Sequence, residues 1–278
     1  MLATLLLVGC TPPPEGERPT VTETVWTTHT PPAAPPAQPA PDQPPAEQSP
    51  VEQAVAQVVA RHGGQAEVAV FEGTHAHSAG RVDDPPAWST IKVPVAVAAL
   101  RERPDLLDAV RAAITVSDNQ AAEQLWDFLG TPEEAGRATE EVLAETGVGT
   151  AVETSFPRPE FSSYGQTRWS PAEQARFAAG LPCLAGAGPV LEAMGQITAG
   201  QDYGLGTIPG ARYKGGWGPD PDSSYVVRQF GLLPAADGPG VGAVALVVRP
   251  ASGTYADGQA MLTDLAAQLP DLPAVDCP

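Results

Sequence analysis

The chain has 278 residues, enough for one large domain or two small ones. It carries 33 acidic and only 15 basic residues, which gives a formal charge of -18 at pH 7. Nucleic acid is therefore not an expected partner, because binding to phosphate needs clustered Lys and Arg side chains.

Residues 1–10 form a short apolar run that ends at Cys10. The run is too short to cross a bilayer. Leu7-Val8-Gly9-Cys10 resembles a bacterial lipobox, in which the Cys is diacylated and becomes the mature N-terminus, although the run lacks the Lys or Arg that signal peptides normally carry. We expect a lipoprotein signal peptide over 1–10 and a lipid anchor on Cys10 at the extracytoplasmic face of the cell membrane.

Residues 11–50 hold 13 prolines in 40 positions and too few apolar side chains to build a core. This composition predicts a disordered or partly polyproline tether. Ser49-Pro50-Val51-Glu52 then has the form of a capping box with Pro at the first helical position. The globular domain is therefore expected over residues 51–278.

The three cysteines fit an exported protein. If Cys10 takes lipid, Cys183 and Cys277 remain as a pair, and an oxidising compartment favours a disulfide between them. Such a bridge would tie the C-terminus to the body of the domain. Two unpaired thiols are the alternative.

Hydrophobic periodicity predicts the elements of this domain in chain order. One helix and a two-stranded hairpin come first, helices fill the middle, and three strands and a closing helix come last. The expected helices are about 51–62, 85–100, 105–114, 121–129 and 132–146, one that starts at 171, and then 189–197 and 255–269. The expected strands are about 66–73, 75–82, 211–217, 225–233 and 242–249.

Sequential strands joined by short turns predict an antiparallel sheet of about five strands, two N-terminal and three C-terminal, flanked by helices. The fold class is therefore α+β rather than an alternating parallel α/β fold. Residues 148–169 lack periodicity and are expected to form a long loop, which in a compact domain is usually functional.

Residues 85–100 contain a single charge, that of Lys92, three residues after Ser89. On a helix the two side chains would share a face. Burial lowers the pKa of a Lys, and an amine that loses its proton readily beside a hydroxyl is a base beside a nucleophile. The chain has 13 Arg but only two Lys, Lys92 and Lys214, and Arg does not release its proton. The alternative is a compositional bias that left two lysines by accident.

Three short motifs occur in the order Ser89-x-x-Lys92, Ser117-Asp118-Asn119 and Lys214-Gly215-Gly216. Together they resemble the signatures of the penicillin-recognising serine enzymes, the superfamily of β-lactamases and D-Ala-D-Ala peptidases. Individually each motif is weak, because the second is also a helix N-cap and the third is also a turn. The resemblance covers about residues 51–270 and implies the β-lactamase/transpeptidase-like fold.

The resemblance implies a role for each side chain of these motifs. Ser89 would be the acylated nucleophile and Lys92 its base, and Ser117 would pass a proton to the leaving group. Asn119 would contact substrate or Lys92, and Lys214 would supply positive charge near Ser117 and the substrate carboxylate.

The resemblance also implies how substrate would be held. The backbone N–H groups of Ser89 and Trp217 would form the oxyanion hole. Gly215, Gly216 and Arg228 are the expected substrate contacts. Gly215 lacks the hydroxyl that the family usually carries there, and Ser223, Ser224 or Arg228 on the next strand would have to replace it. No metal or cofactor is needed, and a monomer is expected.

Three departures limit the resemblance. Only 28 positions separate Ser89 from Ser117, so the helical subdomain is expected to be reduced. The loop 148–169 lacks the Glu-x-x-Leu-Asn pattern that holds the deacylating water in class A β-lactamases, and its Glu160 reads either as a solvated carboxylate or as a base. Gly215 replaces the usual Ser or Thr.

These motifs favour an extracytoplasmic serine hydrolase that acts on a cell-wall peptide or a β-lactam-like small molecule and is poor at β-lactam turnover. The alternative is a non-catalytic lipoprotein of the same fold that binds or scaffolds in the cell envelope. A metal site at His75-x-His77 lacks accompanying ligands. A Ser-His-Asp triad lacks a Gly-x-Ser-x-Gly turn.

Overall fold

The computed structural model describes residues 48–236 and 238–276. The first helix of this part, α1 (Pro50–His62), starts at the predicted capping box: Ser49 accepts from the Glu52 backbone, and the Glu52 side chain reaches back to the Ser49 N–H at 2.7 Å. Within these ranges no helix is long and apolar enough to cross a membrane. The predicted signal peptide, most of the tether, Cys10 and Cys277 lie outside the described residues.

The five strands form one sheet in the order β2-β1-β5-β4-β3, and every neighbouring pair is antiparallel. The predicted α+β fold with two N-terminal and three C-terminal strands is confirmed. The N-terminal pair lies beside β5, so β2 and β3 are the two edge strands of the sheet. The strands are β1 (Gln65–Glu72), β2 (His75–Gly80), β3 (Arg212–Pro219), β4 (Tyr225–Pro234) and β5 (Val241–Arg249).

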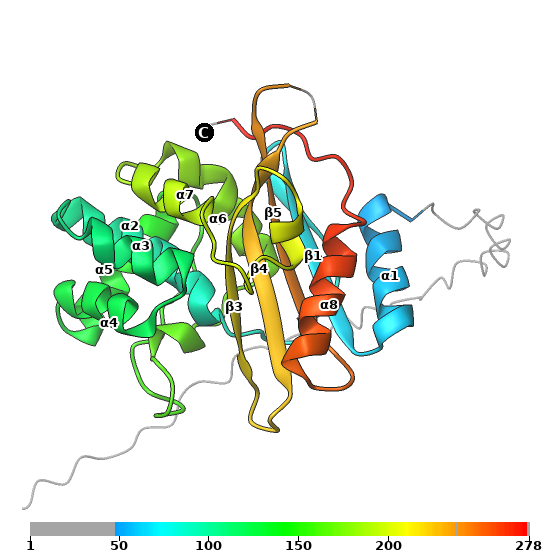
Figure 1. Ribbon diagram of the computed structural model, residues 1–278. Helices are drawn as coiled ribbons and strands as arrows, with labels where there is room; N and C mark the ends of the chain where they lie inside the picture. Colours follow the sequence, from blue (N-terminus) through cyan, green and yellow to red (C-terminus); the bar gives the residue numbers. More distant parts are fainter. Residues whose placement is uncertain (1–47, 237, 277–278) are drawn as a thin grey trace, which may run out of the picture. The chain divides into compact units, whose positions relative to one another are not determined.

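Helices cover both faces of the sheet (Figure 1). On one face α1 and α8 (Tyr255–Ala266) pack against the strands and against each other. On the other face lie the remaining helices, of which α6 packs directly on the sheet. They are α2 (Lys92–Glu102), α3 (Leu107–Thr115), α4 (Asn119–Phe128), α5 (Pro132–Ala144), α6 (Pro171–Gly180) and α7 (Gly188–Met194).

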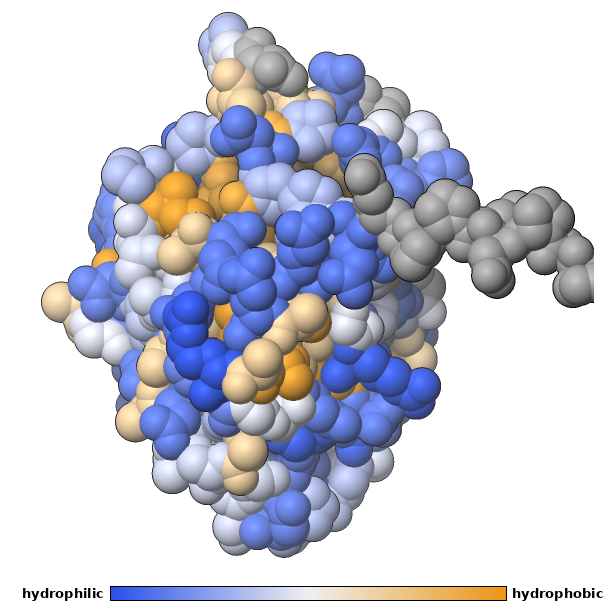
Figure 2. All heavy atoms as spheres, turned by 90° about the vertical axis from the view of Figure 1, so that its right-hand side faces the viewer, coloured by the Kyte–Doolittle hydropathy of each residue, from blue (hydrophilic) through white to orange (hydrophobic). Residues whose placement is uncertain are grey.

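The double covering explains the residue pattern of the strands. Residues 242–248 of β5 are all buried, so this strand reads as a continuous apolar run rather than an alternating one. Hydrophobic core therefore lies on both sides of the sheet. Helix α1 turns Val51, Ala54, Val55 and Val58 inward. The side of the molecule that carries α1 and α8 is mainly hydrophilic outside (Figure 2).

The helix predicted over 85–100 is partly wrong. A 3-10 turn, Trp88–Ile91, comes first, and the α-helix begins only at Lys92. Pro94 is therefore the third residue of α2, where a backbone N–H has no partner within the helix. Proline at this position therefore removes no hydrogen bond from the helix.

The long loop predicted over 148–169 is confirmed, with one 3-10 turn, Tyr164–Gln166, inside it. The Gln166 side chain holds this loop together. Its Oε1 accepts from the Arg158 N–H at 3.1 Å, and its Nε2 donates to the Arg158 carbonyl at 3.0 Å. At the end of the loop, Arg168 forms an isolated bridge with Pro86, just before the turn that carries Ser89. The loop is thereby held beside that turn.

Candidate active site

Ser89 lies in the 3-10 turn through which the chain enters α2. Buried polar contacts support this turn: the Thr90 hydroxyl donates to the Ala87 carbonyl and accepts from Gln174 Nε2 at 2.8 Å. Trp88 has a φ of +49°, in a region that bulky residues rarely adopt. Surrounding contacts must hold such a backbone in place, which is common at functional sites. The turn thus presents Ser89 in one defined orientation.

Lys92 is 2% exposed and is held by acceptors from the loop before α4 and from the first residue of α4. Its Nζ donates to the Ser117 carbonyl and to Asn119 Oδ1, both at 2.7 Å, and lies 3.4 Å from Ser117 Oγ. Burial lowers the pKa of Lys92 to about 8, although the charge of Asp118 opposes this shift. Near neutral pH a useful fraction of this amine is therefore unprotonated and able to accept a proton.

Ser117 is the meeting point of the two lysines. Its Oγ accepts a hydrogen bond from Lys214 Nζ at 2.9 Å, and its backbone adopts a φ of +58°, which is uncommon for residues other than glycine. Lys214, on β3, is fully buried and also donates to the Gly215 carbonyl at 2.8 Å. Burial, and secondarily the charge of Lys92, hold the pKa of Lys214 well below its usual range. Two amines far apart in the sequence therefore converge on one hydroxyl.

Gly216 brings the edge strand β3 against the turn that carries Ser89. A Cβ on Gly216 would lie 2.8 Å from the Ala87 carbonyl oxygen and 3.0 Å from the backbone nitrogen of Ser89. A Cβ on Gly218 would lie 2.5 Å from the ring of Trp88. Only glycine permits this approach. The contact places the β3 backbone against the turn that carries Ser89. The pairing of the Ser89 and Trp217 N–H groups as oxyanion donors stays a prediction.

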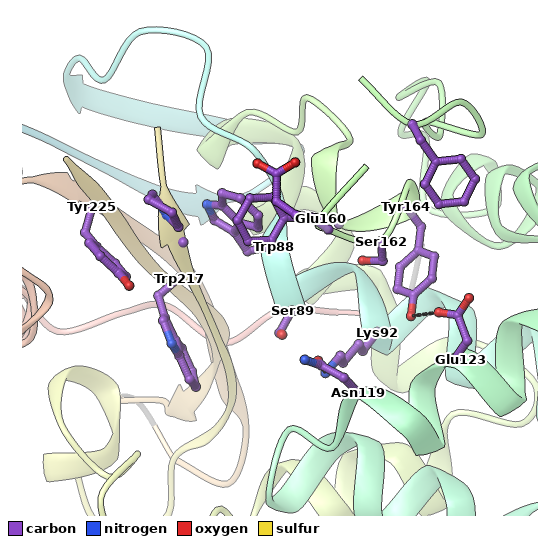
Figure 3. Close-up of a pocket in the computed structure, with 15 residues that line it drawn as sticks. Trp88, Ser89, Lys92, Asn119, Glu123, Glu160, Ser162, Tyr164, Trp217 and Tyr225 are labelled. Atoms are coloured by element: carbon purple, nitrogen blue, oxygen red, sulfur yellow. Dashed lines mark hydrogen bonds between the residues drawn. The ribbon is translucent and has the colours of Figure 1, made fainter. Parts of the chain in front are cut away.

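A cavity of about 500 Å³ opens beside Ser89. Ser89, Lys92 and Asn119 all line it, and Trp217 and Tyr225 lie on its opposite side (Figure 3). Much of the remaining wall is aromatic. The six aromatic residues that line the cavity are Trp88, Phe156, Phe161, Tyr164, Trp217 and Tyr225.

Two side chains of this cavity, Glu123 and Tyr164, were not among the residues predicted from the sequence. Tyr164 donates a hydrogen bond to Glu123 at 3.1 Å, and both residues face the cavity (Figure 3). Burial, followed by the charge of Glu123, raises the pKa of Tyr164 above its usual value, so the phenol stays a donor. Glu123 was detectable in the sequence, because it stands four residues after Asn119 and therefore on the same face of α4. Tyr164 carried no such signal, because it lies in the aperiodic loop.

Arg228 does not take the predicted substrate-binding position. It lies on β4, an interior strand, and it is fully buried behind the turn that carries Ser89. Burial lowers the pKa of its guanidinium to about 9. The guanidinium donates instead to four protein acceptors, namely the carbonyls of Pro85 (3.0 Å), Pro86 (2.8 Å) and Trp169 (2.7 Å) and the Gln174 side chain (2.6 Å).

Gly215 also departs from its predicted role. Successive residues of a strand face opposite sides, so the Cβ position of Gly215 points away from that of Gly216. Its nearest neighbour, at 3.7 Å, would be the Tyr203 hydroxyl. Gly215 is therefore not a wall of the cavity.

Glu160 lines the cavity, but its side chain is 54% exposed and pairs with Arg158 at 3.0 Å. Its own backbone N–H, and then Arg158, hold the pKa of this carboxyl below its usual value. A carboxylate of this kind is a weak base, which agrees with the interpretation of Glu160 as a solvated loop residue.

Two further predictions concern cysteine and metal sites. Cys183 ends a short 3-10 helix, Leu181–Cys183, and its predicted partner Cys277 lies outside the described residues, so the disulfide stays a prediction. Over residues 48–236 and 238–276, no group of three His, Cys, Asp or Glu side chains is arranged to hold a metal ion.

No protein-family model matches the chain, and no curated protein matches it in sequence. Solved structures do. A representative of class A β-lactamase from Bacteroides cellulosilyticus superposes with a TM-score of 0.63 at 16% identity and covers 80% of this chain and 97% of that one. A β-lactamase from Chitinophaga pinensis gives 0.63 at 17% identity and covers 79% and 98%.

The chromosome-encoded β-lactamase of Vibrio parahaemolyticus gives a TM-score of 0.60 at 14% identity and covers 78% of this chain and 96% of its own. Each of the three structures is matched over nearly its whole length, so the shared architecture includes both helical layers and the sheet. At these identities the likeness is one of fold, and the chain has the fold of the serine β-lactamase and penicillin-binding superfamily.

Proposed function

We propose that this protein is a serine hydrolase that transfers acyl groups through Ser89. The observation that carries the proposal is the convergence of Lys92 and Lys214 on Ser117, in a site where Ser89 and Lys92 line one cavity. An amine with a pKa of about 8 is a base suited to work near neutral pH. The fold is the one in which the three quoted motifs occur, which supports the same chemistry.

The proposed reaction has two steps. Neutral Lys92 takes the proton of Ser89 Oγ, which attacks the carbonyl carbon, and the backbone N–H groups of Ser89 and Trp217 stabilise the resulting oxyanion. The proton then passes from Lys92 through Ser117 to the leaving nitrogen or oxygen as the bond to the leaving group breaks. Water afterwards hydrolyses the acyl ester and regenerates the Ser89 hydroxyl.

The substrate class we propose is a peptide, amide or ester of the cell envelope. Turnover of β-lactams would be poor, because Glu160 is exposed and paired with Arg158 and offers no buried base to activate a deacylating water. This same feature favours the second candidate, a lipoprotein that binds or scaffolds without turnover.

Location is part of the proposal. The lipobox-like Leu7-Val8-Gly9-Cys10 supports a lipid anchor at the extracytoplasmic face of the cell membrane, with the Pro-rich residues 11–50 as a tether. We further propose that the protein acts as a monomer.

One experiment separates the two candidate functions. The full chain and its Ser89→Ala variant are incubated with a fluorescent penicillin and with a panel of activated esters, and the intact mass is then measured. The hydrolase predicts an acyl adduct on the wild type that is absent from Ser89→Ala. Absence of an adduct with the whole panel would support the binding module.

A further inference from the structure

The charges around the cavity limit which acyl donors it can accept. The geometry points to an acyl donor that carries an ammonium group and no carboxylate, selected by Glu123, an inference that rests on the proposed acyl transfer through Ser89. Such a preference would set this site apart from one that holds the carboxylate of its substrate.

The cations near the cavity are already committed to protein acceptors. Lys214 is fully buried and donates to Ser117 Oγ and the Gly215 carbonyl. Lys92 donates hydrogen bonds to the Ser117 carbonyl and to Asn119 Oδ1, and it is partly neutral near pH 8. No Arg or His lines the cavity among the described residues.

The guanidinium of Arg158, which belongs to the loop 148–169, is also engaged by protein groups. It pairs with Glu160, donates to the Pro219 carbonyl and stacks over the ring of Phe161 at 4.4 Å. Glu160, Phe161 and Pro219 all line the cavity, so Arg158 cancels the charge of Glu160 instead of offering a free cation. A substrate carboxylate therefore meets no available positive partner, and its burial there would be costly.

Glu123 is the carboxylate that remains uncompensated. It is exposed in the cavity wall, and its hydrogen-bond donor is the neutral phenol of Tyr164 rather than a cation. Trp217 and Glu123 lie on opposite sides of Ser89 (Figure 3). A substrate bound at Ser89 with one end beside Trp217 can therefore extend its other end towards Glu123. The formal charge of the chain, -18, adds a field of the same sign.

The aromatic walls fit the same ligand. Six aromatic residues line the cavity, and an ammonium group binds to aromatic faces through cation–π attraction. A carboxylate gains nothing from these faces. The walls and the carboxylate of Glu123 therefore favour one class of substrate, an ester or amide with a cationic group on an apolar body.

The test uses three activated phenyl esters of 3-phenylpropanoic acid that differ only in the para substituent of the acyl ring: trimethylammonium, hydrogen or carboxylate. The full-length protein is acylated at low ionic strength, and each kcat/KM is divided by the rate of hydroxide hydrolysis of that ester. We expect the ammonium ester to exceed the carboxylate ester by about tenfold or more, because juxtaposed like charges are strongly unfavourable. The ratio should shrink at high salt.

Glu123→Gln should move this ratio towards one. Glu141→Gln is the matched control. Glu141 is an exposed residue of α5 that does not line the cavity, so this variant should keep the wild-type ratio. A ratio near one in the wild type, or a ratio that Glu123→Gln leaves unchanged, overturns the inference and leaves the hydrolase intact. Glu123→Gln could instead slow deacylation equally for all three esters and leave the ratio of ammonium to carboxylate ester unchanged. That result also overturns the inference, because Glu123 would then act as a base.

Binding provides a readout that does not depend on chemistry. The three matching amides are titrated into the Ser89→Ala variant by calorimetry, and the same order of affinity is expected. If no ester acylates Ser89 but the amides bind in this order, the proposed function fails and the inference about the cavity stands. Equal affinities of the three amides overturn the inference.

Discussion

The site is built on one hydroxyl shared by two amines. Ser117 Oγ lies 2.9 Å from Lys214 Nζ and 3.4 Å from Lys92 Nζ, and both amines are almost fully buried. Burial lowers the pKa of Lys214, and the nearby charge of Lys92 lowers it further. The arrangement therefore favours a site that holds fewer than two protons on its lysines, which is the condition for one of them to act as a base.

The pH dependence of acylation tests this role of Lys92. Only the neutral amine can take the Ser89 proton, and the neutral fraction rises with pH through the pKa of about 8. The acylation rate constant should therefore rise about tenfold per pH unit below about pH 8 and level off above it. Stopped-flow measurement with an activated ester from pH 6 to pH 10 provides the profile.

Lys92→Arg is the matched control, because Arg keeps the positive charge but does not release its proton. We expect this variant to acylate at least about 100-fold more slowly than the wild type. A flat wild-type profile across this pH range would rule out Lys92 as the base.

Two adjacent glycines on β3 allow a paired test of the oxyanion hole. A methyl group at Gly216 would lie 3.0 Å from the Ser89 nitrogen and 2.8 Å from the Ala87 carbonyl oxygen, whereas a methyl group at Gly215 would meet nothing closer than 3.7 Å. Gly216→Ala should slow acylation by about 100-fold or more, the typical effect of losing one oxyanion donor. Gly215→Ala should fold and acylate like the wild type, and thermal unfolding confirms that both variants are folded. If Gly216→Ala acylated at the wild-type rate, the Ser89 N–H could not be one of the oxyanion donors.

At the scale of elements, the turn that carries Ser89 depends on its neighbours for its position. Arg228 from β4 and Gln174 from α6 hold it from behind, and Gly216 and Gly218 of β3 pack against its other side. The strained backbone of Trp88 is maintained by these contacts rather than by local preference. The geometry of the nucleophile is thus a property of the sheet and α6 as much as of the turn itself.

Arg228→Met tests this structural role. Loss of a buried guanidinium leaves four acceptors with weaker or no partners, so the free energy of unfolding should fall by about 3 kcal/mol or more. Arg168→Met removes an exposed guanidinium, 58% exposed and paired with Asp84, and should cost about 1 kcal/mol or less. Urea denaturation measures both. If Arg228→Met left the free energy of unfolding unchanged and raised KM, Arg228 would be a substrate contact after all.

At the scale of the whole molecule, the described residues form a sheet enclosed by two helical layers, with the cavity at the edge strand β3. Residues of α4 and of the loop 148–169 complete the wall of this cavity. Residues 1–47 lie outside this description, and their proposed role is to keep the domain at a membrane.

Cys10→Ser tests the anchor. When the full chain is produced in a bacterium that processes lipoproteins, the wild type should appear in the membrane fraction with a diacyl mass increment on Cys10. The Cys10→Ser variant should move to the soluble fraction, because a lipid chain contributes about 0.8 kcal/mol of membrane affinity per buried CH₂. A wild type without lipid, or a variant that stays in the membrane fraction, contradicts the proposed location.

Much of the fold was readable along the chain because its signals are local. The capping box at Ser49 marked the start of a helix, and all five expected strands agree with the observed ones to within a few residues. The lysines were conspicuous because the chain otherwise uses Arg for positive charge. Local patterns, turn residues and side-chain chemistry were therefore sufficient for the fold class and for the residues to consider.

Tertiary structure alone decided which of those residues meet, because contacts between distant segments leave no periodic trace in a single sequence. It put Lys214 against Ser117, turned Arg228 inward from an interior strand, and paired Tyr164 from an aperiodic loop with Glu123. It also decided that Ser89 lies in a 3-10 turn, because the packing of β3 and α6 overrides the helical preference of the residues that follow.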